Sequence, residues 1–405
     1  MYLVPDVAWD VGYDSTPQDP SNLGVNTYHV QGVEVRSPPM RDCPESYQHL
    51  QDVIDMVVKN FRTRVNPTCG LHVHVGSGVK PAFDNDGDPL LRGGLGDHVG
   101  GDYAYVSRPH SLRVLKRAAC LLWALDGFMC HIHPPERGFN TFCRSIRQLS
   151  NLALDNYSTG FGGNVKGPDP CPPDIPVEKE SYRDTFKRLS DKRFPALRPS
   201  SLDADAITRL ASAGIDPVGG GEDDLPVVNR TVMDGVHGIM QCREHRDVEF
   251  LMQSRYSRAN YNFMHYQDFQ NENPPSNSLL TIEFREAAGS VSPTWTTTYA
   301  RICVGIFNFA RNASRERFLK VISRLAQAEK AAMDGLPNKY DIISALQDMA
   351  LYAPAAYLEA QLSSDPLRFW YPNRVVYNDN RAHSDEVSWT TEVEEDWEGR
   401  PAERW

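Results

Sequence analysis

Two histidines separated by a single residue are the groups in this chain best placed to do chemistry. His72 and His74 alternate with Leu71, Val73 and Val75. In an extended strand successive side chains point to opposite faces, so this run predicts a strand with both imidazoles on one side. Neutral imidazole coordinates metal ions and protonated imidazole binds anions. The pair could therefore hold a metal or a phosphate, and the plain alternative is a strand surface that simply faces solvent.

Two further segments repeat this design with charged residues. Glu34 shares one face of the run 32–36 with Arg36, and Glu283 shares one face of the run 281–285 with Arg285. Strands disfavour Glu unless its face is wet or functional. For either run alone, an ordinary solvated face with Glu–Arg pairs is a sufficient explanation. Taken together, the three runs predict one polar sheet surface that carries Glu34, His72, His74, Glu283 and Arg285.

Such a surface suits a metal–nucleotide site. Carboxylates that converge on one face favour hard cations such as Mg²⁺, which prefers oxygen ligands and bridges to phosphates. Arg285 could clamp a phosphate or a carboxylate with two hydrogen bonds, or form a structural ion pair with Glu283 or Glu34. Weaker candidates are Arg137, after a Pro-Pro turn, and Arg255 and Asn260, in another polar segment.

Helical spacing of apolar residues predicts the elements that support these strands. We expect helices over about 42–61 and 111–130 and a mainly helical region over 295–361, which together with the strands indicate an α+β fold. Stretches rich in Gly, Pro or Asp predict loop insertions at about 83–103, 160–176 and 214–226. The acidic tail, residues 372–405, lacks a burial period and is predicted to be disordered or a docking segment.

Composition excludes several classes of protein. The 405 residues include 53 acidic and 42 basic ones, and a net charge of −11 argues against a nucleic acid or an anionic membrane as the main partner. The longest apolar run is well short of the ~20 residues that span a bilayer, so no membrane segment is expected. Eight scattered cysteines without a C-x-x-C pair predict reduced thiols and a cytoplasmic location.

Six segments, in this order along residues 9–310, resemble the amidoligase family, which is related to the carboxylate–amine ligases of the glutamate–cysteine ligase and glutamine synthetase type. They are Trp9 with Asp14-Ser15, Gly32–Pro38, Cys69–Val75, Pro135–Asn140, Arg255–Asn260 and Thr281–Arg285. The resemblance implies a glutamine synthetase-like fold: an antiparallel, half-barrel-like sheet, covered on one face by helices, with ATP and Mg²⁺ on its concave face. It also suggests a fungal source.

The resemblance further implies an ATP-dependent ligation. A small-molecule or peptide carboxylate would take the γ-phosphate to give an acyl phosphate, and an amine would displace the phosphate to form an amide or peptide bond. By position, Glu34, His74 and Glu283 would hold Mg²⁺, and His72 would reach metal or phosphate. Arg285 would neutralise charge on the transferred group. The remaining candidates for binding the substrate carboxylate or the nucleotide would be Arg137, Arg255 and Asn260.

On this basis residues 1–313 would form the ligase-like domain and residues 314–371 a helical extension. Members of the family carry a Gly-x-Glu-x-Glu strand ahead of the segment with Trp9, and this chain starts only eight residues before that tryptophan. We therefore expect two metal-binding carboxylates to be missing, and with them the activity if the chain is complete.

Two other functions stay open. A zinc hydrolase built on His72 and His74 would need a third protein ligand and an open coordination position. The loose candidates for that ligand are His98, His110, His131 and His133. A non-catalytic nucleotide-binding relative would keep the pocket without the chemistry.

Overall fold

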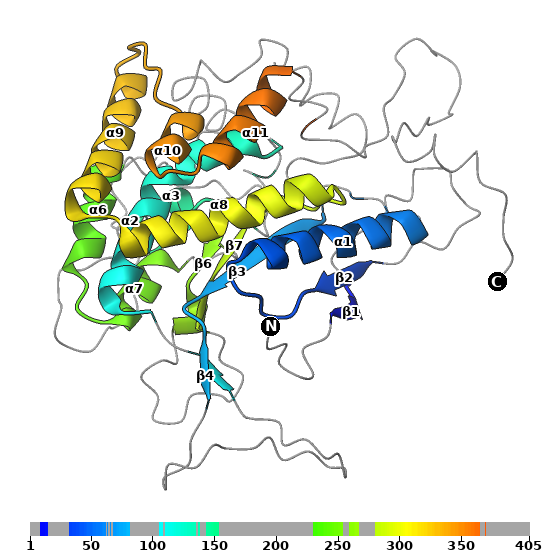
Figure 1. Cartoon of the computed structure of the whole chain (residues 1–405). Coiled ribbons are helices and arrows are strands. Elements are labelled where there is room, and N and C mark those ends of the chain that lie inside the picture. Colours follow the sequence, from blue (N-terminus) through cyan, green and yellow to red (C-terminus); the bar gives the residue numbers. More distant parts are fainter. Residues whose placement is uncertain are drawn as a thin grey trace, which may run out of the picture.

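The computed structural model combines helices with small antiparallel sheets (Figure 1). It describes residues 9–14, 32–61, 63, 65, 68–81, 105–107, 110–134, 137, 143–153, 230–253, 259–266, 280–364 and 369. The three predicted loop insertions, the acidic tail and Arg255 lie outside these residues.

The central sheet has three antiparallel strands in the order β3 (Gly70–Gly76), β7 (Thr281–Ala288) and β6 (Tyr261–Asn262). Two short two-stranded sheets accompany it. They pair β1 (Asp10–Tyr13) with β2 (Val33–Arg36), and β4 (Val79–Pro81) with β5 (Tyr105–Ser107). The strands predicted at 32–36, 70–76 and 281–285 are all confirmed.

One part of the predicted arrangement is wrong. We expected the strand of Glu34 to join the sheet that carries the histidines, but β2 pairs antiparallel with β1, with Glu34 opposite Gly12. Among the described residues β3 pairs with β7 alone, so β2 is not hydrogen-bonded into the three-stranded sheet. The half-barrel-like sheet of a glutamine synthetase-like fold therefore remains a prediction.

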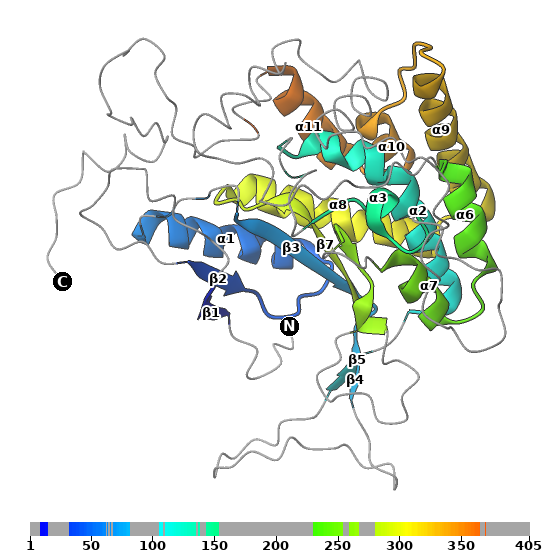
Figure 2. The ribbon, with the colours of Figure 1, turned by 180° about the vertical axis from the view of Figure 1, so that it is seen from behind.

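Helices lie along one side of the central sheet (Figures 1 and 2). The long ones are α1 (Pro44–Asn60), α2 (Leu112–Met129), α8 (Pro293–Asn312) and α9 (Arg315–Met333), and the shorter ones are α3 (Ile146–Leu149), α6 (Val232–Gln241), α7 (His245–Met252), α10 (Ile342–Asp348) and α11 (Tyr352–Ser364). The helices predicted over 42–61 and 111–130, and the helical region after Trp295, are confirmed.

The helix α2 forms the centre of the hydrophobic core. Its N-terminus is capped by Ser111, whose hydroxyl accepts a hydrogen bond from the amide of Val114 at 3.4 Å. The side chains of Leu115, Trp123 and Phe128 are almost completely buried. A β-carbon at Gly235 of α6 would lie 2.0 Å from the Trp123 indole, so only glycine lets the two helices approach this closely.

The helix α9 shares this core. Glu329 of this helix forms an ion pair with Arg147 at 2.5 Å and accepts a hydrogen bond from the backbone amide of Val232 at 2.6 Å. Phe318 and Leu325 of the same helix are buried in the cluster that contains Trp123. Residues beyond 314 are thus packed into the same body as the sheet. Within the described residues, no helix has both the length and the apolar character needed to cross a membrane.

Candidate metal and phosphate site

The alternation predicted for the histidine strand is confirmed. His74 lies opposite Glu283 and Val73 opposite Phe284, and the aliphatic side chain of Val75 is buried with Phe284 on the helical side. The side chains of His72 and His74 are 31% and 38% exposed on the other side. The pairing of β3 with β7 therefore builds a polar face with a hydrophobic face behind it.

An irregularity interrupts this pairing beside the charged residues of β7. Between Leu71 and Val73 the partner strand advances from Ala287 to Phe284, which is one residue more than β3. A β-bulge of this kind re-aims the side chains around it. Beside it, Glu286 accepts a hydrogen bond from the buried hydroxyl of Tyr261 at 2.7 Å and belongs to the core side.

Glu283 is the centre of the polar face, because four other side chains converge on its carboxylate. Arg285 donates to Oε1, and Asn262 donates to Oε2 at 2.8 Å. From Oε1, the Nδ1 atom of His72 is 3.4 Å away and the Nε2 atom of His74 is 3.6 Å away. Four of the five residues predicted for one surface are thus brought together.

The protonation states suit ligation of a cation. Burial alone would raise the pKa of Glu283, but the Asn262 hydrogen bond and the charge of Arg285 outweigh it and hold the pKa below its usual value. Burial and the charge of Arg285 lower the pKa of His72 to about 4, and burial also lowers the pKa of His74. At neutral pH the site therefore offers one ionised carboxylate and neutral imidazoles.

A third imidazole, His265, was not predicted. It lies in a short 3₁₀ turn, Met264–Tyr266, and its ring centroid is 5.5 Å from that of His74. One ligand atom each from His74, His265 and Glu283 lie within 4.8 Å of one another. The Nε2 atom of His265 is buried and has no hydrogen-bond partner among the described residues. The only sequence signal was a histidine shortly after the polar segment that contains Asn260.

These three groups fit a divalent metal ion. Two imidazoles and one carboxylate are the donors that Zn²⁺ and other first-row transition metals prefer, whereas Mg²⁺ prefers oxygen and would need more of it from phosphates or water. The Nδ1 atom of His74 lies 3.2 Å from the hydroxyl of Thr281. With the proton on Nδ1, this contact orients the ring and leaves Nε2 as the ligand atom.

Glu34 lies on the separate ribbon of β1 and β2. Its carboxylate accepts a hydrogen bond from Nε of Arg36 at 2.9 Å, and both side chains are exposed. Its negative charge slightly opposes the lowering of the His74 pKa, less than burial and the nearer charges act on it. The sequence predicted Glu34 as a metal ligand on the same sheet, and its separate ribbon leaves that role a prediction.

Arg137 and Asn260 have internal partners, and this geometry gives no support to the predicted role of either in binding nucleotide or substrate. Arg137 is buried and donates to the backbone carbonyls of Glu286, Arg285 and Cys69 at 3.0, 2.9 and 3.3 Å. Asn260 is also buried, and it donates to Asp126 at 2.6 Å and accepts from the amide of Ile146 at 3.1 Å. Both side chains fix the backbone that carries the site.

The histidines considered as third zinc ligands do not complete the site. His110 and His133 are buried in the core and are only 2% and 1% exposed. His131 lies in the 3₁₀ turn that follows α2, where its Nδ1 atom is 3.2 Å from the carbonyl of Phe128. His98 lies outside the described residues. Within the described part of the chain, the histidine grouped with His74 and Glu283 as a possible ligand is His265.

Comparison with known proteins adds no assignment. No family model matches the chain, and neither the curated proteins nor the solved structures gave a match.

Proposed function

We propose that the polar face of β3 and β7 binds a divalent metal ion together with a nucleotide, and that the protein is a carboxylate–amine ligase. The observation that carries this proposal is the convergence of His74, His265 and Arg285 on the carboxylate of Glu283. The resemblance to the amidoligase family supplies the reaction, with ATP as the nucleotide and Mg²⁺ as the expected metal.

Charge explains why such a site would favour a phosphate ligand. A divalent ion on Glu283 would sit beside the guanidinium of Arg285, so the loaded site would carry more positive than negative charge. An anion such as a triphosphate would neutralise this excess. Because coupling between two ligands is reciprocal, the metal and the nucleotide should each strengthen the binding of the other.

Each residue of the site would have a distinct role in the proposed reaction. His74, His265 and Glu283 would hold the ion, which supplies charge neutralisation at the phosphates when it is bound. Arg285, oriented by Glu283, would place a fixed positive charge where negative charge develops on a transferred phosphoryl group. His72, neutral at pH 7, would contact phosphate oxygens as a hydrogen-bond donor.

The same donor set supports a second candidate, a zinc hydrolase. His265 provides the third protein ligand that this alternative lacked in the sequence, and three ligands leave positions open for water. The two functions differ in whether a nucleotide strengthens metal binding, since a hydrolase of this kind does not bind a triphosphate as a substrate.

Calorimetric titration of Mn²⁺, Zn²⁺ and Mg²⁺, with and without a non-hydrolysable ATP analogue, tests the proposal. We expect the analogue to tighten metal binding, and His265→Ala to weaken it about tenfold or more, a change of about 1.4 kcal/mol. The matched control is His237→Ala, an exposed histidine on α6, which should bind like the wild type.

Three results would decide against the ligase. Unchanged metal binding in His265→Ala would exclude this metal site. Tight zinc binding that ignores the nucleotide analogue would favour the hydrolase. Cooperative binding of metal and analogue, without phosphate release from ATP itself when a panel of carboxylates and amines is added, would point to a non-catalytic relative.

A further inference from the structure

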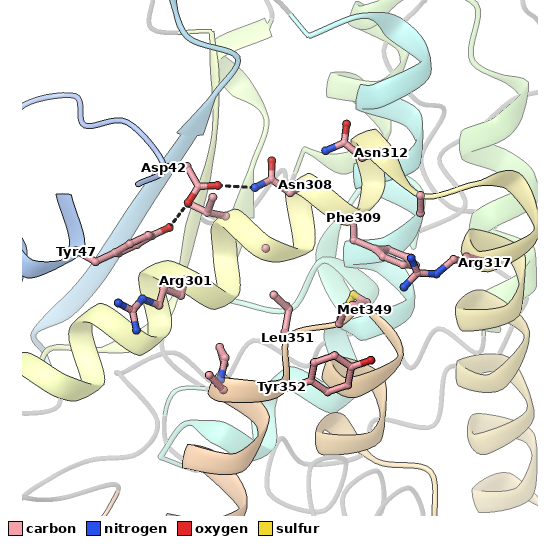
Figure 3. Close-up of a pocket in the computed structure, with 16 residues that line it drawn as sticks. Asp42, Tyr47, Arg301, Asn308, Phe309, Asn312, Arg317, Met349, Leu351 and Tyr352 are labelled. Atoms are coloured by element: carbon pink, nitrogen blue, oxygen red, sulfur yellow. Dashed lines mark hydrogen bonds between the residues drawn. The ribbon is translucent and has the colours of Figure 1, made fainter. Parts of the chain in front are cut away.

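A groove lies on the helical side of the molecule, between α8 and the connection from α10 to α11 (Figure 3). It encloses about 660 Å³. One stripe of α8 forms its long wall, from Arg301 to Asn312. At 1.5 Å per residue this stripe is about 16 Å long, the length of roughly five residues of extended peptide.

The groove combines an apolar floor with basic ends. Val304, Phe309 and Leu351 form the floor, while the exposed side chains of Arg301 and Arg317 flank it. The guanidinium of Arg301 lies over the ring of Tyr47 at 4.8 Å, and that of Arg317 lies over Phe309 at 5.8 Å. These aromatic faces hold both positive charges beside the groove.

Asp42 is the one acidic residue among the described residues that line the groove, and its carboxylate already has partners. It accepts hydrogen bonds from the Tyr47 hydroxyl at 2.8 Å and from the Asn308 amide at 2.7 Å (Figure 3). The net charge of the lining is therefore positive. An elongated groove of this kind fits an extended peptide that carries acidic side chains and one or two apolar ones.

The chain itself contains such a peptide in its tail. Residues 385–398 include seven acidic residues and no Lys or Arg, together with Trp389 and Trp397. In the same region of the molecule, Phe369 packs against Trp295 at the start of α8, with ring centroids 4.9 Å apart. Along α8, Trp295 lies only about 9 Å from Arg301.

The connection is long enough for this peptide to reach the groove. The fifteen residues 370–384 can span about 50 Å when extended, which is several times the distance required. Tethering also raises the effective concentration of the peptide to about the millimolar range, so weak contacts are sufficient for occupancy. We propose that a short stretch within residues 385–398 binds in this groove, with acidic side chains at Arg301 and Arg317 and a tryptophan on the apolar floor.

Photo-cross-linking in the full chain tests this docking directly. A benzophenone amino acid in place of Val393 should give intramolecular cross-links to α8 and to residues 349–354, mapped by mass spectrometry. The double variant Arg301→Glu/Arg317→Glu should lower the yield about fivefold or more, because two exposed charge pairs become repulsive. The matched control Arg315→Glu changes an exposed arginine of α9 outside the groove and should leave the yield unchanged.

A charge swap protects the test against loss of folding. Adding Glu394→Lys and Glu395→Lys to the double variant should restore the cross-links, which a misfolded protein would not do. Cross-links that form elsewhere, or that survive in the double variant, would overturn the proposal. A mixture of isotopically light and heavy chains would reveal cross-links between molecules, and their dominance would show that the groove takes a second copy instead.

Discussion

Removing the charge of Glu283 is the most informative perturbation of the candidate site. The Glu283→Gln substitution keeps the shape of the side chain, but it removes the negative charge beside Arg285 and leaves one acceptor oxygen in place of the two that receive Arg285 and Asn262. Both members of this ion pair are buried, with side chains only 7% and 5% exposed. On an exposed sheet face the same change would spare folding, but the burial of this pair makes it costly.

The magnitude follows from the cost of an uncompensated buried charge. Breaking a buried ion pair by removing one partner destabilises a protein by about 3–5 kcal/mol. Because the Gln carbonyl can still accept a hydrogen bond from Arg285, we expect about 2–3 kcal/mol for Glu283→Gln. Removing both charges in Glu283→Gln/Arg285→Met should cost only about 1 kcal/mol, since neutral replacements of buried pairs are often tolerated.

Urea unfolding of the four proteins in this cycle measures the coupling between the two residues, which should be at least about 1–2 kcal/mol, the excess cost of Glu283→Gln over the double variant. The matched control is Glu34→Gln, which removes the carboxylate from the exposed pair with Arg36 and should change stability by less than about 0.5 kcal/mol. Metal titration of the same variants separates function from folding. The double variant should regain stability and still fail to bind the metal.

Two results would refute this reasoning. Equal stability of Glu283→Gln and Glu34→Gln would mean that the ion pair on β7 is not buried. Wild-type metal affinity in the double variant would mean that Glu283 is not a ligand.

Three further predictions concern pH and packing. The pKa of His72 is lowered to about 4 from its ordinary 6.5, so between these two pH values His72 is protonated in the unfolded chain and neutral in the folded protein. The stability that this shift contributes should thus be fully present above pH 6.5 and fall by about 1–2 kcal/mol towards pH 4, after allowance for solvent screening of the ring. In urea titrations at several pH values, His72→Gln should flatten this decline. Ala350, at φ 65°, has the left-handed backbone that favours glycine. Ala350→Gly should therefore stabilise the protein by about 0.5–1 kcal/mol and raise its melting temperature. A lower melting temperature would contradict backbone strain at this position. Gly235→Ala should destabilise the protein by about 2–3 kcal/mol, because its β-carbon would overlap Trp123, whereas Gly238→Ala on the same helix meets only the end of a leucine at 3.0 Å and should be nearly neutral by calorimetry.

Local patterns in the sequence were sufficient to predict most of the elements. Alternation of aliphatic and polar residues in 70–76 and 281–285 predicts two strands, each with one polar face, and both are confirmed. Helical spacing likewise predicts α1, α2 and the helices after Trp295. These features depend on neighbours within a few positions, which is why they can be read from a single chain.

Tertiary structure decided which of these faces meet. The contact between His74 and Thr281 joins residues 207 positions apart, and no local pattern determines such a pairing. Pairing of β2 with β1 leaves Glu34 on a separate ribbon, and a single 3₁₀ turn brings His265 to the site. Arg137 and Asn260 turn inward because buried carbonyls and the buried Asp126 require partners. Periodicity therefore determined the elements and their faces, while the need to bury apolar surface and satisfy buried polar groups decided which residues form the site.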